Sequence, residues 1–368
     1  MNTAEFIQLL QVSNQSLRHE WDRVLGNLGF HEFQEKMIRR EQEGKVPDEE
    51  RIRRYRTKTP SEIGEEQFQQ IVDLVLSFLT QEERILSKDI VYKQFWTSEM
   101  NAFAVRVPEG PKLILINRGC AVSFAHAATA LTDSAVSTPE SEIGAFVRDG
   151  IILYMSALEM LTRDSVSNVT DITERQHRVL LGDKYKAELA DMLYMSFMVF
   201  VIGHELGHHL LGHLGDFHPS GLMCRGNPVL YYSYSRKCEY EADLYAWDLL
   251  RRIIVEQSSD RHRGERLSLN RLCIVAPLLL MSLFESADTL NCGGLVRMAS
   301  DTASHPSGYE RRVALEPYIA KYFDVSHTAF IRAVNHFFFK DIPSSFRETL
   351  PMSDGALVVS NILNIPPY

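Results

Sequence analysis

Residues 199–218 read VFVIGHELGHHLLGHLGDFH, and this segment carries the most informative pattern in the chain. Its apolar lead-in, Val199–Ile202, predicts a helix that is buried at this point. The segment His204-Glu205-Leu206-Gly207-His208 places two imidazoles one turn apart on the same helix face. Two such imidazoles can bind one Zn²⁺ at about 2.0–2.1 Å, with the glutamate between them as a general base. In the alternative interpretation the histidines bind nothing, but buried imidazoles need polar partners, and a metal ion is one.

A catalytic zinc ion needs a third protein ligand and an open position for water. In the metzincin pattern, glycine and histidine follow three and six residues after the second ligand. Those positions hold Leu211 and Leu214, so this pattern is excluded. His209, His213 and His218 remain available, and we interpret them as residues that surround the site or lie on the surface.

A second group of donors follows in Cys238-Glu-Tyr-Glu-Ala-Asp243, at the start of a helix predicted for 239–255. Glu239 and Asp243 are four positions apart, so their carboxylates share one helix face. One of them can bind zinc while the other accepts a hydrogen bond from a ligand imidazole and holds its tautomer. The alternative is an acidic first turn favoured only by the helix dipole.

The clearest strand signal surrounds the turn Pro108–Pro111. Asn101–Val107 precedes this turn and Leu113–Ile116 follows it, which predicts a β-hairpin. Thr59-Pro60-Ser61-Glu62 is typical of a helix start, and an apolar stripe from Phe68 to Leu79 follows it. We predict a loop at 132–142 and helices at 143–163, 184–214, 272–284 and 329–339. The expected fold class is mainly α (α+β), with a small sheet or hairpin.

The composition excludes several classes of protein. Of the 368 residues, 45% are hydrophobic and 24% charged, which excludes wholesale disorder. The net charge of −9 argues against a nucleic-acid partner. Five cysteines without tight spacing suit reduced thiols in a cytosol. The N-terminus lacks a secretory signal, and Met192–Gly203 and Leu272–Phe284 are shorter than the roughly 18 apolar residues of a membrane span. We therefore expect a soluble, cytoplasmic protein.

Four motifs in order resemble the gluzincin zinc metallopeptidases of the HtpX and CAAX-prenyl-protease type. Two of them are the H-E-x-x-H segment and the later Glu239-x-x-x-Asp243. Asn101-Ala102-Phe103-Ala104 is similar to the N-A-F-A edge strand of that family. Ser304-His305-Pro306, with Arg311 six residues after the histidine, is similar to its late H-P-x-x-x-x-R element. The four motifs span roughly residues 95–315.

The resemblance implies a zincin-like fold and a role for each matching residue. His204, His208 and Glu239 would bind one catalytic Zn²⁺, and Glu205 would be the general base. Asp243 would orient a ligand histidine. The other implied roles are oxyanion stabilisation by His305, support of the site or substrate by Arg311, and binding of an extended peptide along Asn101, Ala102, Phe103 and Ala104.

The chain departs from the membrane members of that family because we find no membrane span in it. We expect a helical N-terminal region at 1–90, a zincin-like metallopeptidase domain at 91–325 and a helical tail at 326–368. The leading hypothesis is a soluble zinc endopeptidase that cleaves a protein or peptide substrate.

Two other hypotheses remain. The charged segment Glu32–Arg56 could receive a regulatory partner, which favours a zinc-binding sensor or interaction module that cuts little or nothing. The tyrosines of Tyr231-Tyr-Ser-Tyr234 could line the pocket of a hydrolase acting on a small molecule. If the N-terminal region gates the cleft, removing residues 1–56 should raise basal activity.

Overall fold

The computed structural model describes most of the chain from residue 30 to residue 137 and the helices that follow. The described ranges are 30–43, 49–96, 102–106, 111–137, 184–214, 222–224, 227–229, 235–259, 273–281 and 306–321, with positions 14–15, 18–19, 22–23 and 284. Within this part, 79% of the residues are helical and a small mixed sheet accompanies them. The expectation of a mainly α fold with a small sheet is therefore confirmed. Several predictions fall outside these ranges: the helices at 143–163 and 329–339, the tail at 326–368, Asn101, His218, the tyrosines at 231–234 and His305.

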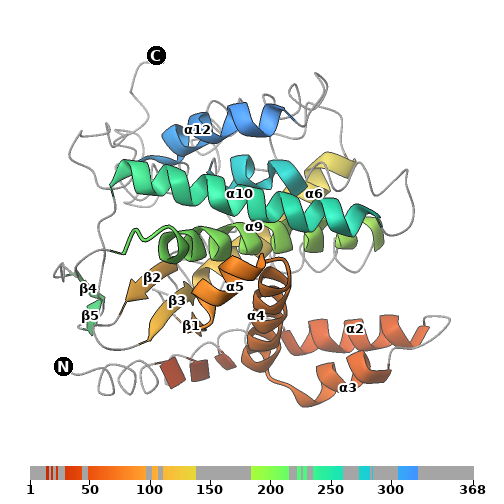
Figure 1. The fold of residues 1–368 in the computed structure, drawn as a ribbon. Coiled ribbons are helices and arrows are strands. Elements are labelled where there is room, and N and C mark those ends of the chain that lie inside the picture. Colours follow the sequence, from red (N-terminus) through yellow and green to blue (C-terminus); the bar gives the residue numbers. More distant parts are fainter. Residues whose placement is uncertain are drawn as a thin grey trace, which may run out of the picture.

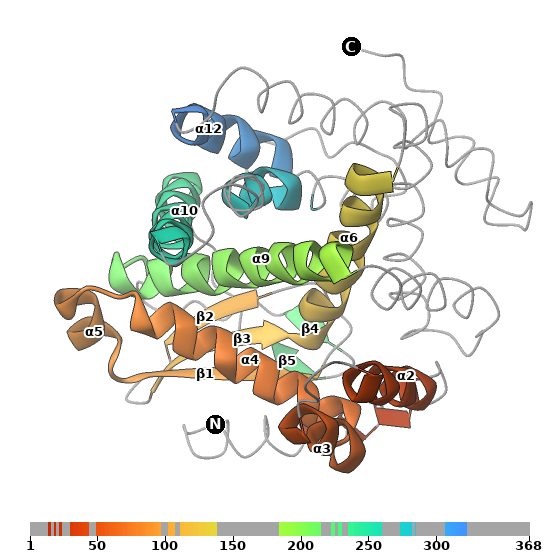
Figure 2. The ribbon, with the colours of Figure 1, turned by 90° about the vertical axis from the view of Figure 1, so that its right-hand side faces the viewer.

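Helix α9 (Lys184–Leu210) is the central element of the fold. It lies between the sheet on one side and helix α10 (Arg236–Ser259) on the other, and helix α12 (Gly308–Ala320) lies beyond α10 (Figure 1). The view turned by 90° shows the same order of layers (Figure 2). Helix α9 also contacts α6 (Arg118–Ser137). The prediction of a buried helix through residue 204 is confirmed, although the helix ends at Leu210 rather than at 214.

The sheet has three strands in the order β1-β3-β2. Strands β2 (Ala102–Arg106) and β3 (Lys112–Asn117) pair antiparallel, with Ala104 opposite Ile114, so the predicted hairpin is confirmed. Strand β1 (Ile90–Phe95) pairs parallel with β3 and has no counterpart in our sequence analysis. Strand β2 therefore stands at an edge of the sheet and contacts α9. A further short ribbon is formed by β4 (Leu222–Cys224) and β5 (Asn227–Val229).

The helices before the sheet are α2 (Phe30–Glu43), α3 (Glu49–Thr57), α4 (Pro60–Ser77) and α5 (Gln81–Ser87). Helix α4 begins as its sequence predicts, because the Thr59 side chain accepts from the Glu62 backbone N–H and the Glu62 carboxylate accepts from the Thr59 backbone N–H. The apolar face of α4 packs into the same core as α9. Helices α2 and α3 lie together beside the start of α4 (Figure 2).

Earlier positions of the chain reach back to these elements. Asp22 accepts hydrogen bonds from the backbone N–H and the hydroxyl of Ser61, at 2.9 and 2.8 Å. The side chain of Asn14 donates to the Gln94 carbonyl (3.1 Å) and accepts from the Trp96 backbone N–H (2.7 Å). The N-terminal region is therefore bonded both to α4 and to the end of β1.

Two predictions along the chain need correction. Residues 132–137 belong to helix α6 rather than to a loop. The polar residues Thr132, Asp133 and Ser134 continue a helix that starts at Arg118. Helix α12 was not predicted, although Ser307 and Glu310 form a capping box at its start. The apolar helix expected at 272–284 is present and buried over residues 273–281.

Helix α9 is also long and apolar enough to cross a membrane, judged by length and composition alone. Its segment Lys186–Leu210 has a hydropathy of 1.4, and 78% of the qualifying window is buried inside the protein. The core helix of a folded domain meets the same test, and the apolar side chains of α9 belong to the main core. The expectation that the chain lacks a membrane span stays a prediction.

Candidate metal centre

Three buried side chains from two helices bring their donor atoms together. His204 and His208 come from α9 and Glu239 from the first turn of α10. The two Nε2 atoms of the histidines are 3.1 Å apart. Each lies 3.5 Å from an oxygen of Glu239. This group could bind a metal ion.

The separations fit the ligand shell of a tetrahedral ion. Donors about 2.0–2.1 Å from a tetrahedral zinc ion are about 3.4 Å from each other. The two imidazole nitrogens are 3.1 Å apart, and each lies 3.5 Å from a different oxygen of Glu239, Oε2 for His204 and Oε1 for His208, so the carboxylate faces both. Two imidazoles and one carboxylate are also the ligand set of a catalytic zinc site. The residues present therefore suit Zn²⁺ in both donor type and spacing.

Small residues let the two helices approach closely enough for this. A Cβ atom added at Gly203 would lie 3.2 Å from the Ala246 Cα, and one added at Gly207 would lie 3.2 Å from the Ala242 Cα. The two glycines of α9, four positions apart, therefore face the two alanines of α10, which are also four positions apart. Because Glu239 is on α10, this close contact sets the distance from its carboxylate to the histidines of α9.

A second layer of charge holds His204. The Asp243 carboxylate, 1% exposed, lies 2.9 Å from His204 Nδ1. Arg311 of α12 donates to both Asp243 oxygens, from Nε at 2.8 Å and from Nη2 at 2.5 Å. Arg311 Nη2 also lies 3.3 Å from His204 Nδ1, but both atoms carry protons when His204 donates to Asp243. We therefore assign the His204 hydrogen bond to Asp243, which leaves Nε2 of His204 for a metal ion.

The charges around these groups shift their pKa values. Burial and Arg311 both lower the pKa of His204, but hydrogen bonds to Asp243 and Glu239 outweigh them and raise it to about 9. Burial raises the pKa of Asp243, yet the charge and hydrogen bonds of Arg311 hold it below its usual range. The pKa of His208 falls to about 2 because it is buried beside His204. His208 is thus a neutral imidazole, the form that binds metal.

Glu205 lies beside the donor group and takes no part in it. Burial raises the pKa of its carboxyl group to about 7, with a further contribution from the negative charge of Glu239. The backbone N–H of Ala104, on β2, donates a hydrogen bond to this carboxylate. Glu205 is therefore held between the metal centre and the edge strand.

His208 has a polar partner on its other side as well. Its Nδ1 lies 3.1 Å from Nδ1 of His213, and Nε2 of His213 lies 3.1 Å from Glu241 Oε2. Sequence analysis placed His213 only as a residue around the site or on the surface. Its contact with His208 depends on the turn after α9, where Gly212 takes a positive φ of 72°. That turn brings His213 back towards α9.

The structure brings together six residues that the sequence singled out: His204, Glu205, His208, Glu239, Asp243 and Arg311. Ala102, Phe103 and Ala104 lie on the edge strand, and Ala104 reaches Glu205. His305 and Asn101 lie outside the described residues, so their roles stay predictions. Sequence analysis did not find that His209 binds the Leu113 carbonyl at 2.9 Å and so ties α9 to β3.

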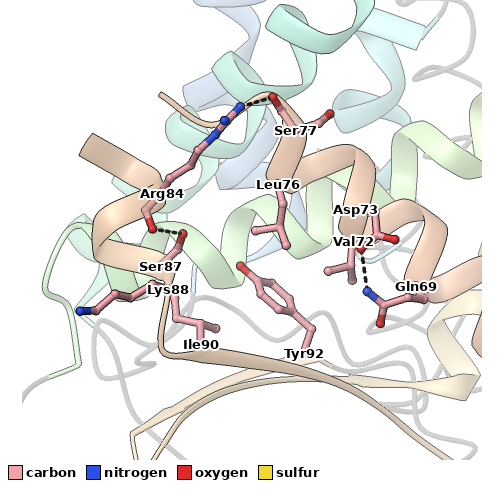
Figure 3. A pocket seen from close by; sticks show the side chains of 10 residues that line it. All are labelled: Gln69, Val72, Asp73, Leu76, Ser77, Arg84, Ser87, Lys88, Ile90 and Tyr92. Carbon is pink, nitrogen blue, oxygen red and sulfur yellow. Dashed lines mark hydrogen bonds between the residues drawn. The ribbon is translucent and has the colours of Figure 1, made fainter. Parts of the chain in front are cut away.

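A pocket separate from this centre lies between α4, α5 and β1 (Figure 3). Its volume is about 640 Å³, and Figure 3 shows Tyr92 lying across it below Leu76 and Val72. The Tyr92 hydroxyl is buried and has no hydrogen-bond partner among the described residues. Its lining contains no histidine or cysteine, and no described residue of the metal centre contributes to it.

Comparisons of the chain with family models, with curated proteins and with solved structures found no match. The functional interpretation therefore rests on the residues of this chain and on their geometry.

Proposed function

We propose that the chain is a zinc-dependent endopeptidase with a zincin-like fold, similar to a gluzincin. The observation that carries the proposal is the position of Glu205. It is buried next to the His204, His208 and Glu239 donors, and a backbone N–H of the edge strand holds its carboxylate. A metal site with only a structural role has no use for a carboxylate in that place.

The edge strand supports a peptide rather than a small molecule as substrate. Strand β2 stands at the edge of the sheet, and its Ala104 N–H points at Glu205. An extended peptide that adds to this edge would lie beside the catalytic carboxylate, in the manner of β-augmentation. This arrangement would bring a backbone carbonyl of the substrate to the metal centre.

The residues of the chain would divide the chemistry among them. A bound Zn²⁺ would act as a Lewis acid and lower the pKa of water towards about 7. The Glu205 carboxylate would take a proton from the attacking water and deliver it to the nitrogen of the leaving amine. Asp243 would keep the proton of His204 on Nδ1, and Arg311 would hold the Asp243 carboxylate in place.

The test compares the wild type with Glu205→Gln, and with Glu256→Gln as a matched control at an exposed position of α10. New protein N-termini are mapped in cells that express each form, and the zinc content of each purified protein is measured. We expect one zinc ion per chain in all three proteins, with new N-termini in the wild type and the control only. Cleavage that persists in Glu205→Gln, or a wild type without metal, would exclude this mechanism.

The same experiment addresses the sensor hypothesis. A protein that binds zinc and a stable partner, with equal partner affinity in the wild type and Glu205→Gln and no new N-termini in either, would be an interaction module.

A further inference from the structure

A second group of metal-ligating side chains lies one step outside the metal centre. His213, Cys238 and Glu241 bring a nitrogen, a sulfur and an oxygen within 4.8 Å of one another. The side chain of Glu241 is 43% exposed and that of His213 only 6%, so an ion would enter from the side of Glu241. His213 follows α9, whereas Cys238 and Glu241 belong to the first turns of α10. The group therefore joins the same two helices as the metal centre does.

The donor types differ from those of the metal centre in one respect. Cys238 is a free cysteine and adds a thiol to the imidazole and the carboxylate. Thiolate ligands favour soft and borderline divalent cations such as Cd²⁺ and Zn²⁺. Two of these groups also have other partners: Ser235 donates to the Cys238 sulfur at 3.1 Å, and the exposed Lys237 lies 3.5 Å from the second oxygen of Glu241, where an ion would replace it.

His213 connects this outer group to the inner one through its two ring nitrogens. Its Nδ1 faces Nδ1 of His208 at 3.1 Å, and its Nε2 faces Glu241 at 3.1 Å. This 3.1 Å contact accommodates one proton, because two N–H groups facing each other would repel. When His208 binds a metal ion through Nε2, its proton is on Nδ1 and is donated to His213. His213 then carries its own proton on Nε2 and donates it to Glu241.

We propose that His213, Cys238 and Glu241 form a second divalent-cation site, and that an ion bound there weakens metal binding by His204, His208 and Glu239. An outer ion would take Nε2 of His213 and displace the proton from that atom to solvent. A neutral His213 would then carry its proton on Nδ1, and this is the proton that otherwise sits on Nδ1 of His208. His208 in turn must carry a proton from solvent on Nε2, the atom that faces His204 and Glu239.

The two sites therefore oppose each other through one shared proton. Both can fill together only if two N–H groups face each other at 3.1 Å or if the contact between the rings breaks. Disturbing the partner of a ligand histidine lowers metal affinity by about 10–100-fold. We expect an outer ion to lower the affinity of the inner site by that amount. This second step rests on the proposed zinc centre, whereas the outer site stands on its own donors.

The first experiment detects the outer ion by its sulfur ligand. Cd²⁺ is added to the full-length protein, and the near-ultraviolet charge-transfer absorption of a metal–thiolate bond is recorded. The inner site has no sulfur and gives no such signal, and the variants distinguish Cys238 from another cysteine of the chain. We expect a saturable signal in the wild type, its loss in Cys238→Ser, and its retention in Cys224→Ser, which removes another cysteine of the same chain. No signal, or a signal that depends on Cys224, would overturn the outer site.

The second experiment measures the opposition between the sites. Zinc affinity is determined by competition with a chromogenic chelator, with and without Cd²⁺, in the wild type, Cys238→Ser and Glu241→Gln. We expect Cd²⁺ to lower zinc affinity about 10–100-fold more in the wild type than in either variant. The variants report any direct replacement of zinc by cadmium in the inner site. An equal loss in all three proteins would overturn the opposition.

Failure of the proposed peptidase would look different. A wild type that shows the thiolate signal and loses zinc affinity in Cd²⁺, yet cleaves nothing, supports the coupled sites and excludes the peptidase. A wild type that never binds zinc excludes the peptidase and the opposition together, and the thiolate signal still decides the outer site.

Discussion

Replacing Gly207 with alanine tests whether the close contact between α9 and α10 sets the metal centre. The new Cβ would lie 3.2 Å from both the Ala242 Cα and the Tyr245 Cδ1. Contacts this short require the neighbours to move by a few tenths of an ångström, and the first of them is backbone. Helix α10 would therefore shift away from α9 and carry Glu239 with it.

The substitution should change both the stability of the fold and the affinity for metal. Alanine favours a helix over glycine by about 0.5–1 kcal/mol, whereas overpacking costs about 1–3 kcal/mol. The free energy of unfolding of the metal-free protein should therefore fall by about 0–2.5 kcal/mol. A shift of Glu239 changes its 3.5 Å distances to both histidines, whereas the two histidines keep their positions on α9. We expect zinc affinity to fall about tenfold or more.

The assay measures zinc affinity by chelator competition and unfolding of the metal-free protein in urea. Gly64→Ala on α4 is the matched control, because an added Cβ there first meets the guanidinium of Arg118, at 2.6–2.7 Å. It overpacks a helical glycine at a cost of about 1–3 kcal/mol without pushing α10. Equal losses of zinc affinity in the two variants, or an unchanged affinity in Gly207→Ala, would refute the argument from helix contact.

Three other changes test the surroundings of the site and the packing of the fold. Asp243→Asn leaves the buried Arg311 without its counter-charge, so unfolding free energy in urea should fall by about 3 kcal/mol; a loss below about 1 kcal/mol contradicts this. Glu83 binds Arg252 at 3.0 Å, and these bonds together with the Thr80 backbone N–H outweigh burial and lower the pKa of Glu83. The stabilisation by ionised Glu83 is therefore complete above its unfolded pKa of about 4.3 and is lost as pH falls through the lower folded pKa. The difference in unfolding free energy between the wild type and Glu83→Gln should thus shrink below about pH 4. A difference that does not depend on pH contradicts this. Asn14→Ala removes two hydrogen bonds to the end of β1 and should cost about 1–3 kcal/mol in thermal unfolding, whereas no loss would mean that this contact is dispensable.

The sequence was most informative where chemistry and periodicity coincide. The spacing of His204 and His208 indicated a helix, and the spacing of Glu239 and Asp243 indicated another, because a helix turn brings residues i and i+4 close together on one face, whereas a strand separates them by about 13 Å. The hairpin followed from its alternating β-branched residues and from its turn. The start of α4 followed from its capping box.

The parts that were missed depend on contacts between distant segments. Strand β1 mixes buried and exposed residues, so its amino-acid sequence alone does not show that it pairs parallel with β3. The end of α6 contains residues that favour turns, and its contact with α9 overrides them. The pairing of His209 with Leu113 spans 96 positions, and no local pattern indicates it.

The metal centre gathers residues from strand β2 and helices α9, α10 and α12, and its arginine lies 107 positions beyond its first histidine. The ribosome therefore releases the edge strand and both histidines well before it supplies the residue that fixes Asp243. A nascent chain that stops before α12 has every donor to the metal but a buried carboxylate without its cation. The assembled centre thus appears late in synthesis, after all three of its metal-ligating side chains.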